Sequence, residues 1–355
     1  MKILMIAKLG PESAYLRLFK KNLALHNVEI DFFNYYQRKQ IFPIFLQVFW
    51  STSKYDVVHF HWTHPYILAN SFAVTLLYSC QFLVDAFLLR LSGAKIVWTI
   101  HNHLSHDGRF KNLDRLVSQL LARMANKIVL LNQTTADMLS QSYSFPLTKA
   151  VIIPHGNYKN YYGSAIQQAD ARKTLDLPLQ GKIYLSLGLI KAYKGLENLI
   201  NVWTSCSALN PDDYLLIVGK VASENYAKVI QEKVSQTPNI ILKAGFVKDD
   251  KIHLFYSAAD IAIFPFKEVL NSGSLILAMT YSKPVIAPNF ESIAEVLDHA
   301  THLLYNPEDP EGLVNALIKS KEVDLNQLTL LTDEACDKLD WENISQLTLD
   351  LYQTV

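Results

Sequence analysis

The sequence predicts an α/β fold with two doubly wound, Rossmann-like domains. Three observations support this prediction. The chain has 355 residues, which is long for one α/β core and fits two domains. Apolar runs of strand length alternate with longer segments of helical period along almost the whole chain. The runs are continuously apolar, as strands covered on both faces must be, and intervening helices favour right-handed crossovers and parallel sheets.

The predicted strands fall into two sets separated by a polar stretch. The first set covers residues 2–7, 28–33, 56–60, 95–100, 127–131 and 150–153. The second set covers residues 183–187, 214–218, 239–242, 261–264 and 284–287. Residues 157–176 show no strand pattern, so we predict an N-terminal domain over residues 1–160 and a C-terminal domain over residues 161–340. Residues 341–355 contain a late amphipathic segment that is typical of a terminal helix.

Composition and charge limit the classes of partner. Lys plus Arg and Asp plus Glu both number 33, and without net positive charge no nucleic-acid partner is expected, because that affinity comes mainly from phosphate neutralisation. Cys80, Cys206 and Cys336 are scattered and share no metal-ligand spacing, which indicates a reducing compartment. The apolar start, residues 1–7, is too short for a secretory signal. We therefore expect a cytoplasmic protein.

Residues 67–91 form the longest apolar segment, and its length would allow it to span a bilayer. Asp85 within it would cost roughly 2.5 to 3.5 kcal/mol to insert. The flanking strands, residues 56–60 and 95–100, also look like neighbours in one sheet. Two interpretations remain: a buried crossover helix, or a helix with one face exposed to lipid. The latter, together with apolar residues 41–50, predicts peripheral contact with the inner face of the cell membrane.

Six of the eleven histidines lie in residues 58–64 and 99–107, directly after two predicted strands. Strand ends of one parallel sheet open into the same crevice, so we expect the two clusters to meet. Metal ligation is the first alternative, since imidazole is a common ligand. No cysteine joins the clusters, however, and Asp107 is their one nearby carboxylate. We therefore predict metal-independent recognition of a sugar acceptor by the following side chains: His61, Trp62, His64 and His103.

Two strand-to-helix loops in the second half are candidate anion sites. In residues 186–195, Gly188 permits close backbone approach, and Lys191 and Lys194 precede a helix; cations at a helix N-terminus are typical of diphosphate binding. In residues 265–274, the first-turn amides of a second predicted helix provide another candidate anion-binding site. The predicted donor-binding residues of that loop are Asn271, Ser272, Gly273 and Ser274. Glu268 stands at its mouth, where it either complements the helix dipole or accepts hydrogen bonds from sugar hydroxyls.

These loops, with residues 259–265 and 278–287, resemble the group 1 (family four) glycosyltransferases of the GT-B fold. So do residues 56–62, 99–102 and 153–156. The resemblance implies two domains facing each other across a cleft, with the last helix, within residues 341–355, crossing back onto the first. It places the nucleotide-sugar donor mainly on the second domain and the acceptor on the first.

The resemblance also assigns roles to individual residues. Lys191 and Lys194 match the two basic ligands of the diphosphate, although the first is more often arginine, whose planar fork a lysine cannot reproduce. Phe246 and Val247 match the loop that contacts the nucleotide base of the donor. His101 matches the histidine that approaches the transferred sugar. The family works without a metal ion, and no cofactor is expected beyond the nucleotide-sugar substrate, UDP- or GDP-linked.

The sequence departs from the family pattern at its paired glutamates. Leu277 occupies the position of the second glutamate, and Glu268 lies one residue before the position of the first. Residues 271–274 replace a Gly-Phe-Gly turn. With these departures, the sequence leaves open whether the anomeric configuration of the transferred sugar is retained or inverted. For inversion, the candidates for the general base are Asp107, His101 and Glu12, in that order.

The predicted function is transfer of a hexosyl group to a glycan acceptor, expected to be lipid-linked, in the synthesis of a surface polysaccharide. Two alternatives remain at this level. The same fold could serve a nucleotide-sugar epimerase or hydrolase. The missing second glutamate is also compatible with a catalytically reduced, donor-binding partner subunit.

Overall fold

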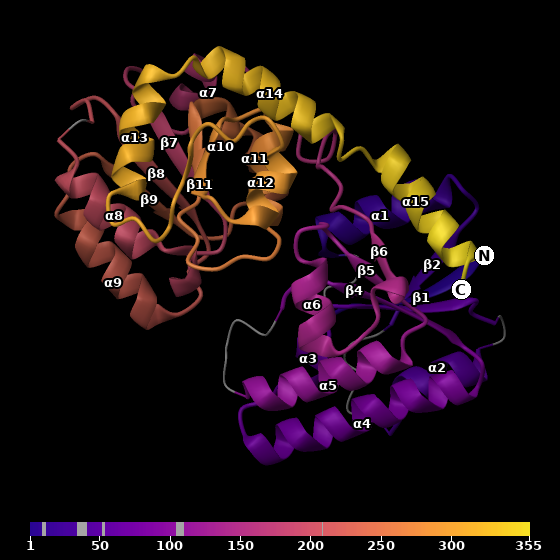
Figure 1. Ribbon diagram of the computed structural model, residues 1–355. Coiled ribbons are helices and arrows are strands. Elements are labelled where there is room, and N and C mark those ends of the chain that lie inside the picture. The colour runs from indigo at the N-terminus through magenta and orange to yellow at the C-terminus, as the bar shows by residue number, and fades with distance from the viewer. Residues whose placement is uncertain (9–11, 34–40, 52–53, 104–109, 208) are drawn as a thin grey trace. The chain divides into compact units, whose positions relative to one another are not determined.

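The computed structural model describes residues 1–8, 12–33, 41–51, 54–103, 110–207 and 209–355. The chain divides into two compact units (Figure 1). Unit 1 comprises Met1–Gly156 together with Asp340–Val355, and unit 2 comprises Asn157–Leu339. Each unit contains one six-stranded sheet in which all the pairings are parallel. The predicted fold class is therefore confirmed.

The sheet of unit 1 reverses its strand order at β1. Across the sheet the strands are β2 (Glu29–Phe32), β1 (Lys2–Ile6), β3 (Val57–His61), β4 (Lys95–Ile100), β5 (Lys127–Leu130) and β6 (Ala150–Ile152). Ligands of such sheets bind beyond the carboxyl ends of the strands at the reversal. β3 and β4 are paired in a register that sets His61 beside Thr99. Their ends therefore carry both histidine-rich turns to one place.

Helices connect and cover these strands. They are α1 (Ala14–Ala24), α2 (Pro43–Trp50), α3 (His64–Ile67), α4 (Phe72–Leu91), α5 (Lys111–Met124), α6 (Ala136–Tyr143), the 3₁₀ turn η3 (Leu147–Lys149) and α15 (Trp341–Gln353). α15 begins after Asp340, whose carboxylate accepts a hydrogen bond from the Asn343 amide at 3.0 Å, a typical N-cap. It packs on α1, so the last helix of the chain belongs to unit 1.

Unit 2 reverses its strand order at β7. Its strands are β12 (Leu304–Tyr305), β11 (Val285–Pro288), β10 (Ile261–Ile263), β7 (Ile183–Leu187), β8 (Tyr214–Gly219) and β9 (Ile240–Ala244). Its helices are α7 (Gln168–Thr174), η4 (Ala192–Lys194), α8 (Leu196–Ser205), α9 (Glu224–Ser235), η5 (Asp249–Lys251), α10 (Ile252–Ala258), α11 (Gly273–Thr280), α12 (Glu291–Leu297), α13 (Gly312–Glu322) and α14 (Leu325–Asp337). The loops after β7 and β10 flank the reversal.

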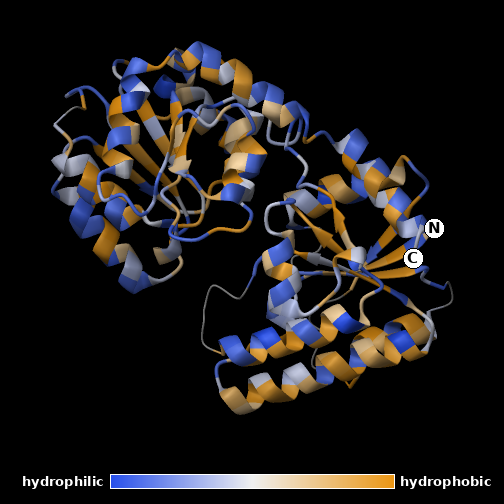
Figure 2. Ribbon diagram, viewed as in Figure 1, coloured by the Kyte–Doolittle hydropathy of each residue, from blue (hydrophilic) through white to orange (hydrophobic). Residues whose placement is uncertain are grey.

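The inner strands of both units are hydrophobic in Figure 2 and mostly buried, as their continuous apolar runs predicted, whereas the outermost strands are partly exposed. β12 was missed, because two residues are too short to form an apolar run. The interpretation of residues 67–91 as a buried helix is wrong. α4 does link β3 to β4 as a crossover. Only 33% of its most apolar 18-residue stretch is buried, however. By length and composition alone, α4 could cross a membrane.

Candidate active site

The ends of β3 and β4 bring His61 and His101 together. A hydrogen bond of 2.8 Å joins His61 Nδ1 to His101 Nε2, and both rings are buried. His61 Nε2 is also buried and has no hydrogen-bond partner among the described residues. Burial lowers the pKa of both imidazoles well below the usual value. Charge repulsion from His59 lowers the pKa of His61 further, and repulsion from His61 and His155 does so for His101. Both side chains are therefore neutral at neutral pH.

Aromatic rings enclose this histidine pair. Trp62 stacks on His101 with ring centroids 4.0 Å apart, although its φ of +41° lies in the left-handed region. A bulky residue in that region is strained, and such strain concentrates at functional sites. Tyr15, near the start of α1, contacts both histidines and the rings of His155 and Trp341. These rings pack together at the carboxyl ends of β3 and β4. Their packing is suited to holding the His101 ring in one orientation.

Three other histidines of unit 1 have structural partners. His59 bonds to the Tyr352 hydroxyl through Nδ1 at 2.6 Å and to Thr99 through Nε2 at 2.8 Å. The imidazole of His64 lies 3.2 Å from the buried Asp114 carboxylate. His103 is 2.7 Å from the Ser142 hydroxyl.

These contacts separate the predicted acceptor residues into two sets. His61 and Trp62 adjoin His101, whereas His64 and His103 bond to helices α5 and α6.

Burial lowers the pKa of His59 to about 3 and that of His155 to about 4. Within the described residues, no group of three or more His, Cys, Asp or Glu side chains could hold a metal ion.

In unit 2, the loops after β7 and β10 converge at Gly188 and Ser274. Gly188 has a φ of +150°, and a Cβ placed on it would lie 2.8 Å from Ser274 Oγ. Glycine is therefore needed both for the backbone angle and for the close approach of the two loops. Ser272 caps α11 and accepts a hydrogen bond from the Leu275 amide at 3.2 Å. The first-turn amides of α11 thus lie beside the Gly188 backbone.

Lys194, at the end of η4, and Gly188 line one concavity. Its volume is about 260 Å³, including the solvent at its mouth. Its ammonium group is 4.5 Å from the centre of the Phe266 ring, close enough for a cation–π contact. Burial lowers the pKa of Lys194 to about 8. Leu189 and Phe264 also line the concavity. An anion here would meet one partly desolvated cation, and Ser274, in the first turn of α11, lies close to the Gly188 that lines the concavity.

The remaining predicted residues are distributed more widely. Lys191 immediately precedes η4 and is half-buried. Phe246 is 77% exposed after β9, next to the half-buried Val247. Asn271 and Gly273 are half-buried beside Ser272, whereas Glu268 is exposed.

Three further positions bear on the departures from the family pattern. Leu277 is buried in α11, so no carboxylate stands at that position. Glu12 is exposed just before α1. Asp107 lies outside the described residues.

Sequence reasoning missed several residues of these two sites. Tyr15, His155 and Trp341 surround the histidine pair, and Phe266 lies under Lys194. A weak signal existed for two of them, because residues 153–156 and the last helix belonged to the recognised pattern. No local pattern pointed to Tyr15, which reads as an ordinary core residue of an amphipathic helix.

Comparisons with known proteins agree for both units. Residues 8–157 match the family model for "Glycosyltransferase Family 4", and residues 181–321 match that for "Glycosyl transferases group 1". The chain is 27% identical over 269 residues to GDP-mannose:glycolipid 4-beta-D-mannosyltransferase of Xanthomonas campestris pv. campestris, covering 75% of this chain and 71% of that one. It is 24% identical over 213 residues to lipopolysaccharide 1,2-N-acetylglucosaminetransferase of Salmonella typhimurium, covering 57% and 55%.

Solved structures share the fold along the whole chain. Anabaena HepE in complex with UDP and glucose is similar with a TM-score of 0.75 and 18% identity, covering 100% of both chains. Sucrose-phosphate synthase from Thermosynechococcus elongatus is similar with a TM-score of 0.77 and 16% identity, covering 100% of this chain and 98% of that one. At such identities, these similarities concern the fold.

Proposed function

The chain belongs to the group 1 glycosyltransferases of family four and has their GT-B fold, and from this premise we propose its reaction. It transfers a hexosyl group from a UDP- or GDP-sugar to a lipid-linked glycan, at the inner face of the cell membrane, in the synthesis of a surface polysaccharide. The observation that carries the proposal is that Gly188 and Lys194 line one concavity, while Ser274, at the start of α11, closely approaches Gly188.

This concavity suits the diphosphate of the donor. The leaving nucleoside diphosphate gains negative charge as the glycosidic bond breaks, and fixed donors stabilise that charge best where water is excluded. Lys194 offers an ammonium group held over the Phe266 ring, and Ser272, Gly273 and Ser274 offer the first-turn amides of α11. Lys191 supplies a second cation at the start of η4. These charges can perform the stabilisation without a metal ion, which we propose for this enzyme.

We assign the sugar to His101 in unit 1. Its Nε2 is bonded to His61, and its lowered pKa makes it a poor proton acceptor at neutral pH. A fixed, neutral ring is better suited to hydrogen-bond a sugar hydroxyl than to act as a general base. If the reaction inverts the sugar, Asp107 and Glu12 are therefore stronger candidates for the base than His101.

The choice of acceptor rests on relatives and on composition. One relative is named as acting on a glycolipid and another on lipopolysaccharide. Both acceptors are amphiphiles, which agrees with the apolar helices of unit 1. Trp62, which stacks on His101 and is half-buried, is the proposed acceptor contact, because a planar ring suits the apolar face of a sugar, and the buried His61 supports it from beneath.

A thermal-shift titration tests the donor site. At about 100 times its dissociation constant, a bound nucleotide stabilises the fold by about 2.7 kcal/mol, so UDP or GDP should raise the melting temperature. Lys194→Ala should remove most of the shift, whereas Lys228→Ala, at an exposed position on α9, should leave it intact. If no nucleotide or nucleotide-sugar shifts the melting temperature of the native chain, the proposed donor is wrong.

Product analysis separates transfer from its alternatives. The buried Leu277 removes one carboxylate from the donor loop, which keeps a donor-binding partner subunit under consideration. We expect radiolabelled sugar to move from donor to a lipid extract. An isomerised or hydrolysed donor without any acceptor would instead indicate an epimerase or hydrolase. Nucleotide binding without any product would favour the partner subunit.

A further inference from the structure

Helix α4 exposes large apolar side chains and buries a mixed face, which also contains the apolar Phe82, Ala86 and Leu89. Its buried residues include the polar Thr75, Ser79 and Asp85. Leu77 and Phe87, by contrast, are 63% and 52% exposed. A helix on the surface of a water-soluble domain normally turns its apolar stripe inward. The exposed apolar residues of α4 are Phe72, Val74, Leu76, Leu77, Val84, Phe87 and Leu91.

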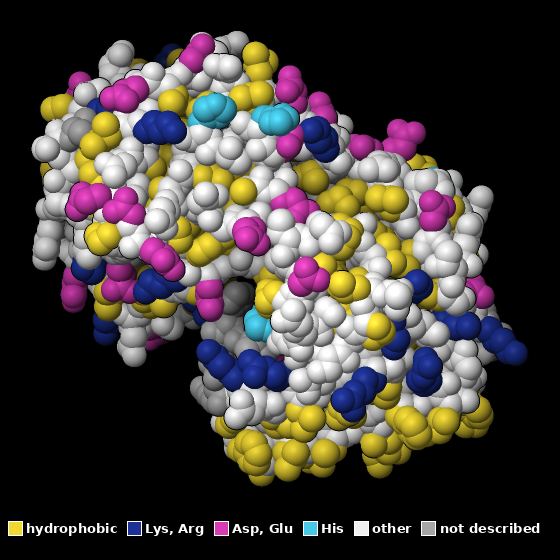
Figure 3. Space-filling view, viewed as in Figure 1, with side chains coloured by type: hydrophobic (Ala, Val, Ile, Leu, Met, Phe, Trp, Pro, Cys, Tyr) yellow, Lys and Arg dark blue, Asp and Glu magenta, His cyan; other side chains and the backbone are white. Residues whose placement is uncertain are grey.

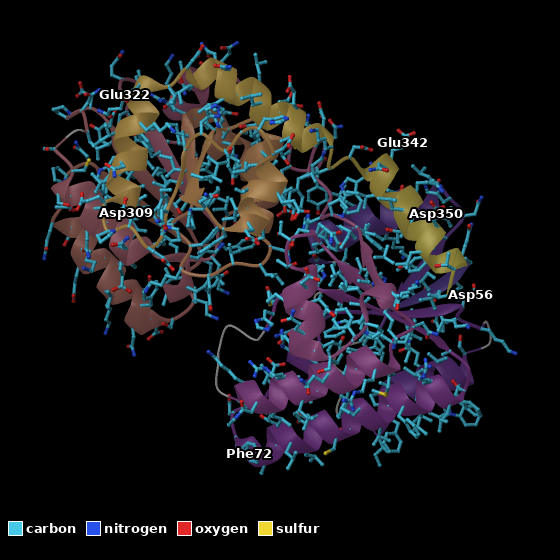
Figure 4. The ribbon with its side chains drawn as sticks, viewed as in Figure 1. Asp56, Phe72, Asp309, Glu322, Glu342 and Asp350 are labelled. Carbon is cyan, nitrogen blue, oxygen red and sulfur yellow. The ribbon has the colours of Figure 1, made fainter. Side chains whose placement is uncertain are left out.

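Helix α2 extends this apolar face. The Asp85 carboxylate of α4 accepts hydrogen bonds from the amides of Ile44 and Phe45, at 3.0 and 2.7 Å. These bonds fix the start of α2 against the middle of α4. At its other end α2 exposes Phe49 and Trp50, at 61% and 74%. Figure 3 shows the result as a continuous hydrophobic band along one border of unit 1, and Phe72 marks one end of it in Figure 4.

The exposed charges of helices α2, α4 and α5 have one sign. Helices α2, α4 and α5 contain two acidic residues, Asp85 and Asp114, and both are buried. Their basic residues are all exposed: Arg90, Lys111, Arg115 and Arg123. Lys and Arg side chains lie along the border of the band in Figure 3. An apolar face bordered by the exposed cations of these helices complements a surface that is apolar inside and anionic outside, as an anionic bilayer is.

The sheet excludes a transmembrane orientation of α4. The strands on either side of α4, β3 and β4, are direct neighbours in the buried sheet, and α4 packs on α5 and on β4. Its inward face contains three polar side chains and is tied to α2 through one of them, Asp85. A spanning α4 would have to carry these elements into the hydrocarbon. The helix is therefore part of the unit's outer layer, and only its outer stripe is free for lipid.

We propose that helices α2, α4 and α5 form a docking surface for an anionic lipid bilayer, on which α4 lies parallel to the membrane plane. This inference rests on the proposed lipid-linked acceptor and names the surface by which the enzyme reaches it. The apolar stripe enters the interface, and the four cations bind lipid phosphates at its edge. Trp50 sits at the level of the headgroups, where tryptophan is enriched.

Vesicle flotation without donor or acceptor tests the apolar stripe. The native chain should float with vesicles of phosphatidylglycerol mixed with phosphatidylcholine. The double variant Leu77→Glu/Phe87→Glu should lose binding by about tenfold or more per substitution. Leu330→Glu is the matched control, because Leu330 is a helical leucine of unit 2 with 65% exposure. Equal loss in this control, or full binding by the double variant, overturns the proposal.

A second pair of variants tests the cationic rim. Lys111→Gln/Arg115→Gln should weaken binding to the anionic vesicles by about fivefold per charge, with no change on phosphatidylcholine alone. Lys228→Gln on α9 is the control for loss of an exposed cation. If the native chain binds both kinds of vesicle equally, the role given to the cations is wrong.

Trp50 reports on the geometry, because it is 74% exposed, whereas Trp62 is half-buried and Trp98, Trp203 and Trp341 are buried. Its fluorescence should shift to shorter wavelength on anionic vesicles, and Trp50→Phe should abolish the shift without preventing flotation. If native chains form a dimer that Leu77→Glu dissociates, and do not float, the surface is a protein interface instead. Nucleotide binding in solution is unaffected by any of these outcomes, so failure of docking is distinguishable from failure of the proposed function.

Discussion

Acidification should destabilise unit 1 selectively through its buried histidines. His59, His61, His101 and His155 are all buried, and burial lowers the pKa of each. In the unfolded chain a histidine titrates near 6.5. Below that pH the unfolded state binds more protons than the folded state, so stability falls as pH falls, until the folded pKa is reached.

The magnitude follows from the two groups with the clearest pKa values. The folded pKa is about 3 for His59 and about 4 for His155. Lowering the pH from about 7.5 to about 5.5 protonates each in the unfolded state only, which costs about 1.4 kcal/mol per histidine. The two together therefore cost about 3 kcal/mol, and His61 and His101 act in the same direction. This is a large fraction of the 5 to 15 kcal/mol typical of a domain.

Hydrogen exchange followed by mass spectrometry suits a chain of two units, for which one unfolding free energy is not well defined. After correction for intrinsic exchange, peptides of β3 and β4 should lose about 3 kcal/mol of protection or more at the lower pH. Peptides of β7 and β10 serve as the internal control, because the described histidines of unit 2 are half-buried or exposed. His59→Gln, which cannot be protonated, should reduce the pH dependence by about 1.4 kcal/mol. Equal losses in both units would refute the reasoning.

Three further perturbations have defined outcomes. Because the pKa of Lys194 is about 8, nucleotide affinity measured by calorimetry should fall as the pH rises above about 8, where the cation is lost, and Lys194→Ala should remove this dependence. Gly188→Ala adds a Cβ 2.8 Å from Ser274 Oγ at a φ of +150°. This variant should bind nucleotide at least tenfold more weakly and keep the far-ultraviolet circular dichroism of the native chain. Unchanged affinity would contradict the close approach of the two loops. Tyr352→Phe leaves His59 Nδ1 unpaired and should cost about 1 to 3 kcal/mol, seen in urea unfolding of unit 1 and as faster exchange in α15.

The strands were predictable because burial on both faces leaves a local record in the sequence. Residues 95–100 and 183–187 match β4 and β7 to the residue, and the other predicted strands differ from the observed ones by one or two residues at their ends. The loops around Gly188 and Ser272 were predictable for a similar reason, since a glycine or a capping serine follows directly from the turn required at a strand end.

The sequence by itself therefore determined the parallel α/β architecture, the two histidine clusters and the two strand-to-helix loops at Gly188 and Ser272. Only the tertiary structure decided which residues meet. The pairing of β3 with β4 selects His61 as the partner of His101 and leaves His64 and His103 bonded elsewhere. It also decided that α4 buries Thr75, Ser79 and Asp85 and leaves large apolar side chains exposed. Local periodicity specifies that a helix has two faces, whereas the neighbours that the chain brings to each face determine which one is buried.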